Sequence, residues 1–294
     1  MSKNPFSLYD FLGYAFPGAI SIILFWFILR VSPNSIYDLL NNNDNLFSLF
    51  KPNNLILLIL ASYVAGHLFA YLSSLIVERF SLWNYDYPSS YLMAEEPPKS
   101  NLFNFKNLET VKIFWRIIFC FVLFPISICS FLFGKCLRIN SYVIRPMDET
   151  TQKHLKEKYP RLLETLNLSD SDEETLNNNY DYHRIIYHYE YEKQSKHSKK
   201  MDNYVALYGF LRSLTLIFTL FFDCLLIKGI LSVNWRMPID WEMIIFITIC
   251  GLIAYTFYLG FIKFYRRFTL ESFMALITDP EIKSPKYEHS HHWH

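Results

Sequence analysis

The sequence predicts an all-α fold: a polytopic membrane helical bundle that carries a small helical cytoplasmic module. The first reason is composition, since 52% of the 294 residues are hydrophobic, 18% are aromatic and only 19% are charged. An ordinary water-facing surface needs more charge than this. The second reason is the presence of several apolar stretches of about 20 residues, the length that a helix needs to cross about 30 Å of hydrocarbon.

Four stretches are predicted to cross the membrane, because each is long, apolar and nearly free of charge inside. They cover residues 11–31, 55–77, 207–232 and 243–264. The first is interpreted as a retained anchor and not as a cleaved signal peptide, since the run is long and no small-residue cleavage site comes after it.

A further apolar segment at 111–138 contains Arg116 and Pro125. If it does not cross, the positive residues outside are only Arg30, Lys51, Lys228 and Arg236, whereas a crossing leaves seven outside. Retained positive charge marks the cytoplasmic side, so the four-span arrangement fits better. Because Pro125 removes a helix hydrogen bond, we expect a re-entrant or kinked element here, with a fifth span as the alternative.

These segments divide the chain into six predicted parts. They are a first transmembrane hairpin (1–77), a polar linker (78–110), the kinked or re-entrant segment (111–138), a helical cytoplasmic module (139–202), a second transmembrane hairpin (203–268) and a cytoplasmic tail (269–294).

The cytoplasmic module is predicted to be helical. Asp148 can cap a helix over residues 151–166, which Pro160 should break or kink. Ser171 and Glu174 form a capping-box pattern, and Tyr182, Ile185, Ile186 and Tyr189 repeat at helical spacing. A module of this size buries little core alone, so we expect it to pack against the membrane helices or against another copy.

Small residues recur every four positions in the second span: Ser62, Gly66, Ala70 and Ser74. A face of small side chains lets helix backbones approach closely, which favours helix association in lipid. The partner is either another helix of the same protomer or a second copy.

A polar stripe accompanies this face. Tyr63, His67 and Tyr71 also lie four residues apart, and Glu78 continues the stripe at the membrane edge. Polar side chains inside a membrane seldom face lipid, so the stripe either lines a water-filled, proton-responsive path or bonds to a neighbouring helix.

Asp223 lies halfway through the apolar run of 207–232. Arg212 is on nearly the same helix face but about 16 Å away along the axis, too far to pair. Arg116 and His67 are the available partners from other helices, and without one the carboxyl would be protonated. Arg212 and Lys228 can extend to the lipid headgroups without a special role.

Several functional classes find no support. The formal charge of +1 gives no basic footprint for nucleic acid. The five cysteines lack the paired spacing of a zinc site or a disulfide framework, and the histidine-rich end at 289–294 is interpreted as a tail and not as a metal site. No phosphate loop, metalloprotease or esterase motif or dinucleotide fingerprint occurs, so neither a cofactor nor an enzymatic activity is predicted.

Four fragments resemble uncharacterised multi-pass bacterial inner-membrane proteins encoded beside anti-phage defence genes. They are Phe16-Pro17-Gly18, the Gly66-His67 helix ending in Glu78-Arg79, the stretch 208–218 and the run 264–268. The resemblance implies an oligomeric membrane effector or accessory that perturbs the envelope.

The sequence therefore predicts an oligomeric protein of the bacterial inner membrane that permeabilises the bilayer on a cytoplasmic trigger. The alternative is a non-conducting accessory or scaffold whose cytoplasmic face recruits a soluble protein partner.

Overall fold

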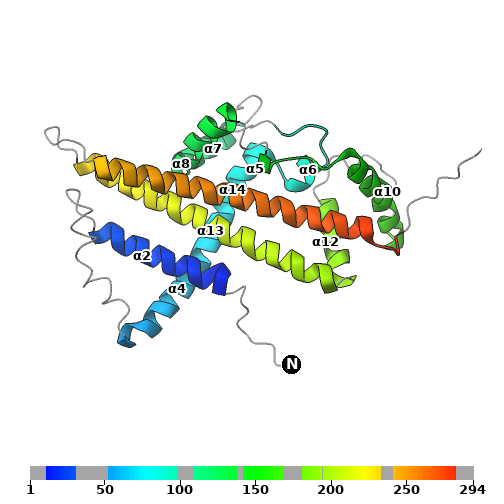
Figure 1. Cartoon of the computed structure of the whole chain (residues 1–294), viewed down its shortest axis with the longest axis horizontal. Helices are drawn as coiled ribbons and strands as arrows, with labels where there is room; N and C mark the ends of the chain where they lie inside the picture. Colours follow the sequence, from blue (N-terminus) through cyan, green and yellow to red (C-terminus); the bar gives the residue numbers. More distant parts are fainter. Residues whose placement is uncertain are drawn as a thin grey trace, which may run out of the picture. The chain divides into compact units, whose positions relative to one another are not determined.

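The computed structural model describes residues 11–30, 52–98, 109–137, 142–168, 181–193, 195–232 and 241–282. Every regular element in these ranges is a helix (Figure 1). The chain forms two compact units: unit 1 comprises residues 1–85, 99–143 and 205–264, and unit 2 comprises residues 86–98, 144–204 and 265–294.

Unit 1 contains most of the apolar helices. They are η1 (Phe11–Ala15), α2 (Phe16–Arg30), α4 (Pro52–Ser73), η3 (Ser74–Glu78), α5 (Arg79–Tyr85), α7 (Thr110–Val122), α8 (Phe124–Cys129) and η4 (Ser130–Cys136), where η marks a π-helical turn. Unit 2 contains α6 (Pro88–Leu92), α10 (Glu149–Thr165) and α12 (Asp181–Lys193). Two long helices, α13 (Ser195–Ser232) and α14 (Trp241–Thr278), contribute residues to both units.

Three helices in the described ranges are long and apolar enough to cross a membrane: Leu55–Leu92, Ser198–Leu231 and Trp241–Thr278. A fourth would be the pair Thr110–Val122 and Phe124–Gly134 if it is counted as one span, although it is bent by 94°. The first predicted span is present as the shorter apolar helix Gly13–Leu29. An all-helical protein with helices long and apolar enough to cross a membrane is thus confirmed for the described residues.

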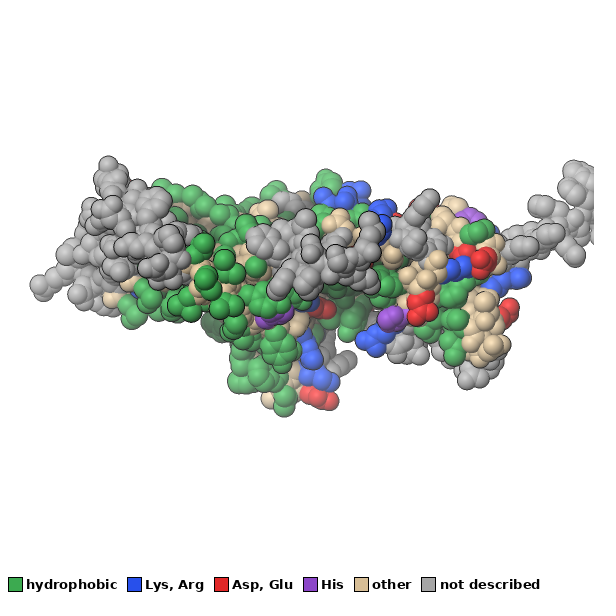
Figure 2. Space-filling model, turned by 90° about the horizontal axis from the view of Figure 1, so that it is seen from below, with side chains coloured by type: hydrophobic (Ala, Val, Ile, Leu, Met, Phe, Trp, Pro, Cys, Tyr) green, Lys and Arg blue, Asp and Glu red, His purple; other side chains and the backbone are tan. Residues whose placement is uncertain are grey.

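The core of unit 1 lies where α13 and α14 run side by side (Figure 1). Phe221 and Leu225 of α13 pack against Met243 and Cys250 of α14, and part of α2 closes over them through Phe27. Many large apolar side chains of unit 1 remain exposed, as expected of helices that meet lipid. Figure 2 shows broad stretches of hydrophobic side chains on the described surface, with separate groups of Lys, Arg, Asp and Glu side chains beside them.

Unit 2 is held together by contacts among three separate pieces of the chain. The backbone N–H of Met147 donates to the carbonyl of Leu92 at 2.9 Å. The Tyr182 hydroxyl donates to the Ser89 carbonyl at 2.6 Å, and the Tyr182 ring stacks on Phe273 of α14. The core of the module is therefore completed by residues on either side of it in sequence.

The structure differs from the sequence-based expectations at two places. Residues 79–92, assigned to a polar linker, form α5 and α6, whose Phe80 and Leu92 are fully buried. Helix α10 runs without a break through Pro160, with Asp148 as its N-cap. The hydrogen bond that Pro160 omits is offset by the burial of Leu155 and Leu162 on the same helix. The capping-box residues Ser171 and Glu174 lie outside the described residues.

Candidate functional site

The small-residue face of α4 meets α2 at a backbone-to-backbone contact. Gly18 of α2 lies so close to α4 that a Cβ there would overlap the backbone of Ser62 and Gly66. A Cβ at Gly66 would in turn overlap the backbone of Tyr14. Ser62 is buried at this contact, and its hydroxyl donates to the Leu58 carbonyl at 2.7 Å. Half of the predicted face thus packs within the protomer.

The other half of that face borders α13. The carbonyl of Ala70 accepts a hydrogen bond from Arg212 Nη2 at 3.5 Å. Ser74 donates to its own helix, at the Tyr71 carbonyl, at 2.6 Å. Neither Ala70 nor Ser74 is fully buried.

The polar stripe of α4 separates into two groups. His67 stacks on Tyr14, with ring centroids 4.0 Å apart, and Tyr63 meets the same imidazole edge-on at 4.5 Å. Tyr71, one turn further on, is 63% exposed. Glu78, the last residue of the π-helical turn η3, forms the second group.

Glu78 forms an ion pair with Arg212 of α13. Both side chains are largely buried, at 25% and 14% exposure. Near this pair, the hydroxyl of Ser73 on α4 meets that of Ser213 at 3.5 Å. Sequence reasoning left Arg212 free to reach the headgroups and placed Glu78 at the membrane edge. A search for one acid and one base on different spans would have found the pair.

Asp223 is placed among apolar neighbours on α13. It makes no hydrogen bond or ion pair with any residue in the described ranges, and neither of the partners considered, Arg116 and His67, reaches it. The guanidinium of Arg116 instead lies 5.9 Å from the ring centre of Trp83, on α5. Lys228, further along α13 from Asp223, donates to the carbonyl of Ile28 near the end of α2.

Unit 2 contains a buried charge cluster that sequence reasoning missed. Lys193 of α12 bonds Asp279 at 2.7 Å and Glu281 at 2.6 Å, both just beyond α14. Lys158 of α10 donates to the backbone carbonyl of Asp279 at 2.6 Å. Glu190 is fully buried among these groups, and neither of its oxygens has a hydrogen-bond partner in the described part of the chain.

Burial, together with the negative charge of Asp279, raises the pKa of Glu190 to about 7, against the attraction of Lys193 and Lys158. Burial also acts to raise the pKa of Asp279. The hydrogen bonds from Lys193 and from the Glu281 N–H, together with the charges of Lys193 and Lys158, outweigh it and leave that pKa lowered. Of the two buried carboxyl groups in the cluster, Asp279 is therefore ionised and Glu190 gains a proton near neutral pH. No pattern in the sequence marks it, because its members are far apart in the chain.

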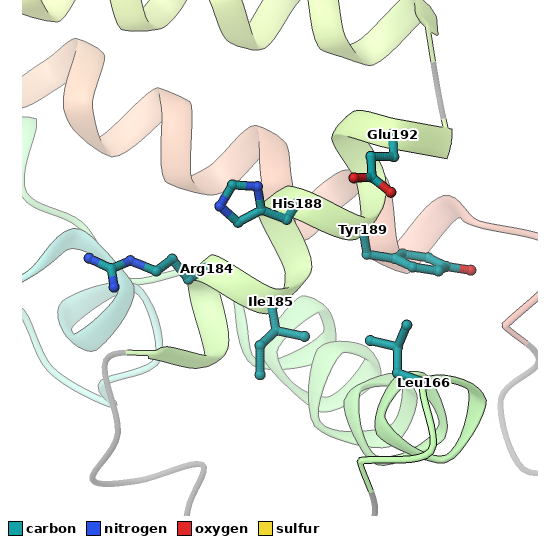
Figure 3. Close-up of a pocket in the computed structure, with 6 residues that line it drawn as sticks. All are labelled: Leu166, Arg184, Ile185, His188, Tyr189 and Glu192. Atoms are coloured by element: carbon teal, nitrogen blue, oxygen red, sulfur yellow. The ribbon is translucent and has the colours of Figure 1, made fainter.

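A shallow pocket of about 440 Å³ lies beside α12 in the same unit (Figure 3). Ile185 and Tyr189 point toward Leu166, which comes directly after α10, while Arg184 and His188 point away from it. The remaining lining residue is Glu192. The pocket is lined by apolar side chains and by side chains of both charges. This combination suits contact with the surface of a protein or peptide.

In the described residues, no group of three or more His, Cys, Asp or Glu side chains could hold a metal ion. The histidine-rich end lies outside these ranges. Comparison with known proteins adds no relative: no family model, no curated protein and no solved structure matches the chain.

Proposed function

We propose that the protein is an oligomeric effector of the bacterial inner membrane that makes the bilayer permeable when a cytoplasmic signal reaches unit 2. The segments 11–31, 55–77, 207–232 and 243–264 are its four spans, and segment 111–138 does not cross. A role in anti-phage defence is suggested by the sequence resemblance alone.

The construction of unit 2 supports this topology. A compact body is not divided by a bilayer, so the contacts within unit 2 support placing its described residues in 86–98, 144–204 and 265–282 on one side. The chain between 98 and 144 must then return to the side that it left. In this arrangement most Lys and Arg residues fall on that same side, which favours the cytoplasm.

Asp223 is the observation that carries the proposed activity. An acid at the centre of a spanning helix costs about 3 kcal/mol on insertion scales, so it normally faces water or a polar partner. Within the described residues it has neither an ion-pair nor a hydrogen-bond partner. A second copy, or a water-filled path between copies, supplies the missing polar surroundings and gives ions a route.

The connection to a trigger comes from α13 and α14. Both helices contribute to unit 2 as well as to unit 1. A shift of either helix within unit 2 is therefore carried by a continuous helix toward Asp223. Elements shared in this way are the physical requirement for coupling two sites.

The test is retention of a potential-sensitive dye in cells that express the wild type or Asp223→Ala. Cys224→Ala is the matched control, since Cys224 is the exposed neighbour on the same helix. We expect loss of potential with the wild type and the control, but not with Asp223→Ala at equal membrane content. Full leakage from Asp223→Ala, and equally from His67→Ala, would exclude the proposed path.

The second candidate function is a non-conducting scaffold that recruits a soluble partner. The observation in its favour is the pocket beside α12, which presents Ile185 and Tyr189 next to Arg184, His188 and Glu192. If this function is right, Ile185→Asp abolishes co-purification of a partner while the wild type leaves membrane potential intact. Dye loss from the wild type would instead favour the effector.

A further inference from the structure

Helix α7 is an apolar helix of unit 1 that has no buried residue. It covers Thr110–Val122, which at 1.5 Å per residue is about 20 Å, too short to cross about 30 Å of hydrocarbon. It ends at Leu123, where the backbone leaves the helical region with φ −105° and ψ 38°. Pro125 lies in the first turn of α8, and the two helices are bent by 94° (Figure 1).

The halves of this bent pair have different environments. In α8, Pro125, Ile126 and Cys129 are buried. Phe124 packs on Phe222 of α13, and Phe133 of η4 stacks on Tyr255 of α14. The second half therefore belongs to the helical bundle, and the bend directs α7 away from the axis of that half.

The two sides of α7 are chemically distinct. One side packs on α5, where Phe119 stacks on Trp83 with ring centroids 4.9 Å apart and Arg116 lies over the same indole. The opposite side is a broad apolar face with exposures from 44% to 72%, made of Val111, Phe114, Trp115, Ile117 and Phe121.

Charge identifies the surface that covers this face. The sequence from 99 to 116 contains Lys99, Lys106, Lys112 and Arg116 against Glu109 alone, a net charge of +3 (four minus one). A helix with a wide apolar face and an exposed tryptophan, in a stretch of sequence with an excess of cations, is typical of one that lies in the plane of the lipid headgroups. Phosphate groups there complement the excess of positive charge.

We propose that α7 is an in-plane anchor, with its apolar face (Val111, Phe114, Trp115, Ile117 and Phe121) in the lipid interface on the cytoplasmic side. This inference rests on the membrane placement of unit 1 given under the proposed function. The return of the chain between residues 98 and 144 agrees with it, because an in-plane helix joined to a partly inserted one leaves both ends on one side.

The test compares depths at two pairs of positions with the same spacing. Spin labels are placed singly on a cysteine-free full-length chain at Phe114 and Phe121 of α7, and at Ile245 and Leu252 of α14, all of which are exposed. The protein is reconstituted into vesicles of phosphatidylcholine and phosphatidylglycerol. Depth is obtained from the relative accessibility of each label to oxygen and to a water-soluble nickel complex.

Seven residues along a helix amount to about 10 Å. We expect Phe114 and Phe121 to lie at the same shallow depth, while Ile245 and Leu252 differ by about 10 Å, as in a spanning helix. A difference of that size between Phe114 and Phe121 would overturn the proposal in favour of an inserted helix.

Two other results would also overturn it, and they are distinguishable. If the α7 labels are shielded from both oxygen and nickel while the α14 pair behaves as a span, a second protein surface covers the face. If the labels on α14 are themselves exposed to water, the membrane placement fails and the anchor fails with it.

Discussion

Several ionisable side chains of this protein find their partners on other helices and not on their own. Arg212 of α13 pairs with Glu78 at the end of η3, and Lys193 of α12 pairs with Asp279 beyond α14. Each pair is largely shielded from water. Removal of one partner therefore leaves a buried charge without its counter-charge. Such pairs therefore specify which helices are neighbours.

The Arg212–Glu78 pair gives the first prediction. Because both side chains are largely buried, Arg212→Leu or Glu78→Leu should each destabilise the protein by about 1–3 kcal/mol. The double variant should cost less than the sum of the two, since no unpaired charge remains. The measurement is unfolding of the purified protein in detergent micelles.

Arg79→Leu serves as the control for this cycle, because Arg79 is exposed and adjacent to Glu78. It should change stability by less than about 0.5 kcal/mol. Strict additivity of the two single variants would contradict a direct interaction between Arg212 and Glu78.

Glu190 gives a pH-dependent prediction. Its pKa is raised in the folded protein from 4.5 to about 7, so folding favours the protonated form. The stability that protonated Glu190 contributes to the folded state is fully present below about pH 4.5 and is lost as the pH rises toward 7. We expect the Glu190→Gln variant to lack this loss of stability with rising pH. At pH 8 its free energy of unfolding should exceed that of the wild type by about 1–3 kcal/mol.

The measurement is the thermal midpoint of the detergent-solubilised chain between pH 5 and pH 8. Other groups with shifted pKa values are present in unit 2, His183 among them, whose pKa is lowered by burial to about 4. The difference between variant and wild type isolates Glu190. Glu192→Gln, an exposed change on the same helix, should behave as the wild type does throughout.

At the scale of the elements, the crossing of α2 and α4 depends on two glycines. Gly18 and Gly66 each lack the Cβ that would overlap the opposite backbone. A backbone cannot move aside as a flexible side chain can, so even one methyl group forces the helices apart. The small-residue pattern in the sequence indicated a close approach, and the structure identifies α2 as the helix that makes it.

Gly66→Ala should therefore destabilise the protein by about 1–3 kcal/mol, through overpacking. Gly209→Ala is a matched control within α13, where an added Cβ would meet no atom within 4 Å. There the better helix propensity of alanine should stabilise by up to about 1 kcal/mol. Equal effects of the two substitutions in an unfolding titration would show that α2 and α4 do not cross at Gly66.

At the scale of the whole molecule, unit 2 is assembled from three pieces that are distant in sequence. Tyr182 joins two of them by bonding Ser89, and Lys158 joins the module to the end of α14. If the apolar helices span a membrane as proposed, a body with such contacts is expected on one side of it. This constraint on the path of the chain is stronger than any count of apolar residues.

Single cysteines on a cysteine-free chain test this constraint. Glu96→Cys, Leu168→Cys and Thr278→Cys are exposed positions in the three pieces, and Trp241→Cys lies at the start of α14. An impermeant maleimide should label the first three from the cytoplasmic side in inverted vesicles, and Trp241→Cys only from the other side in spheroplasts. Labelling of Glu96→Cys and Leu168→Cys from opposite sides would show that segment 111–138 crosses.

Local patterns were enough to predict the helical class, helices apolar enough to cross a membrane and the cap of α10 by Asp148, because these depend on local hydrophobicity and on hydrogen bonds within a few residues. Which distant residues meet depends on how the helices pack. Glu78, the last residue of the π turn η3, pairs with Arg212 of α13, and Asp279, just after α14, lies beside Glu190. Such contacts join residues about 90 to 130 positions apart, where no local pattern records them and only packing in three dimensions brings them together.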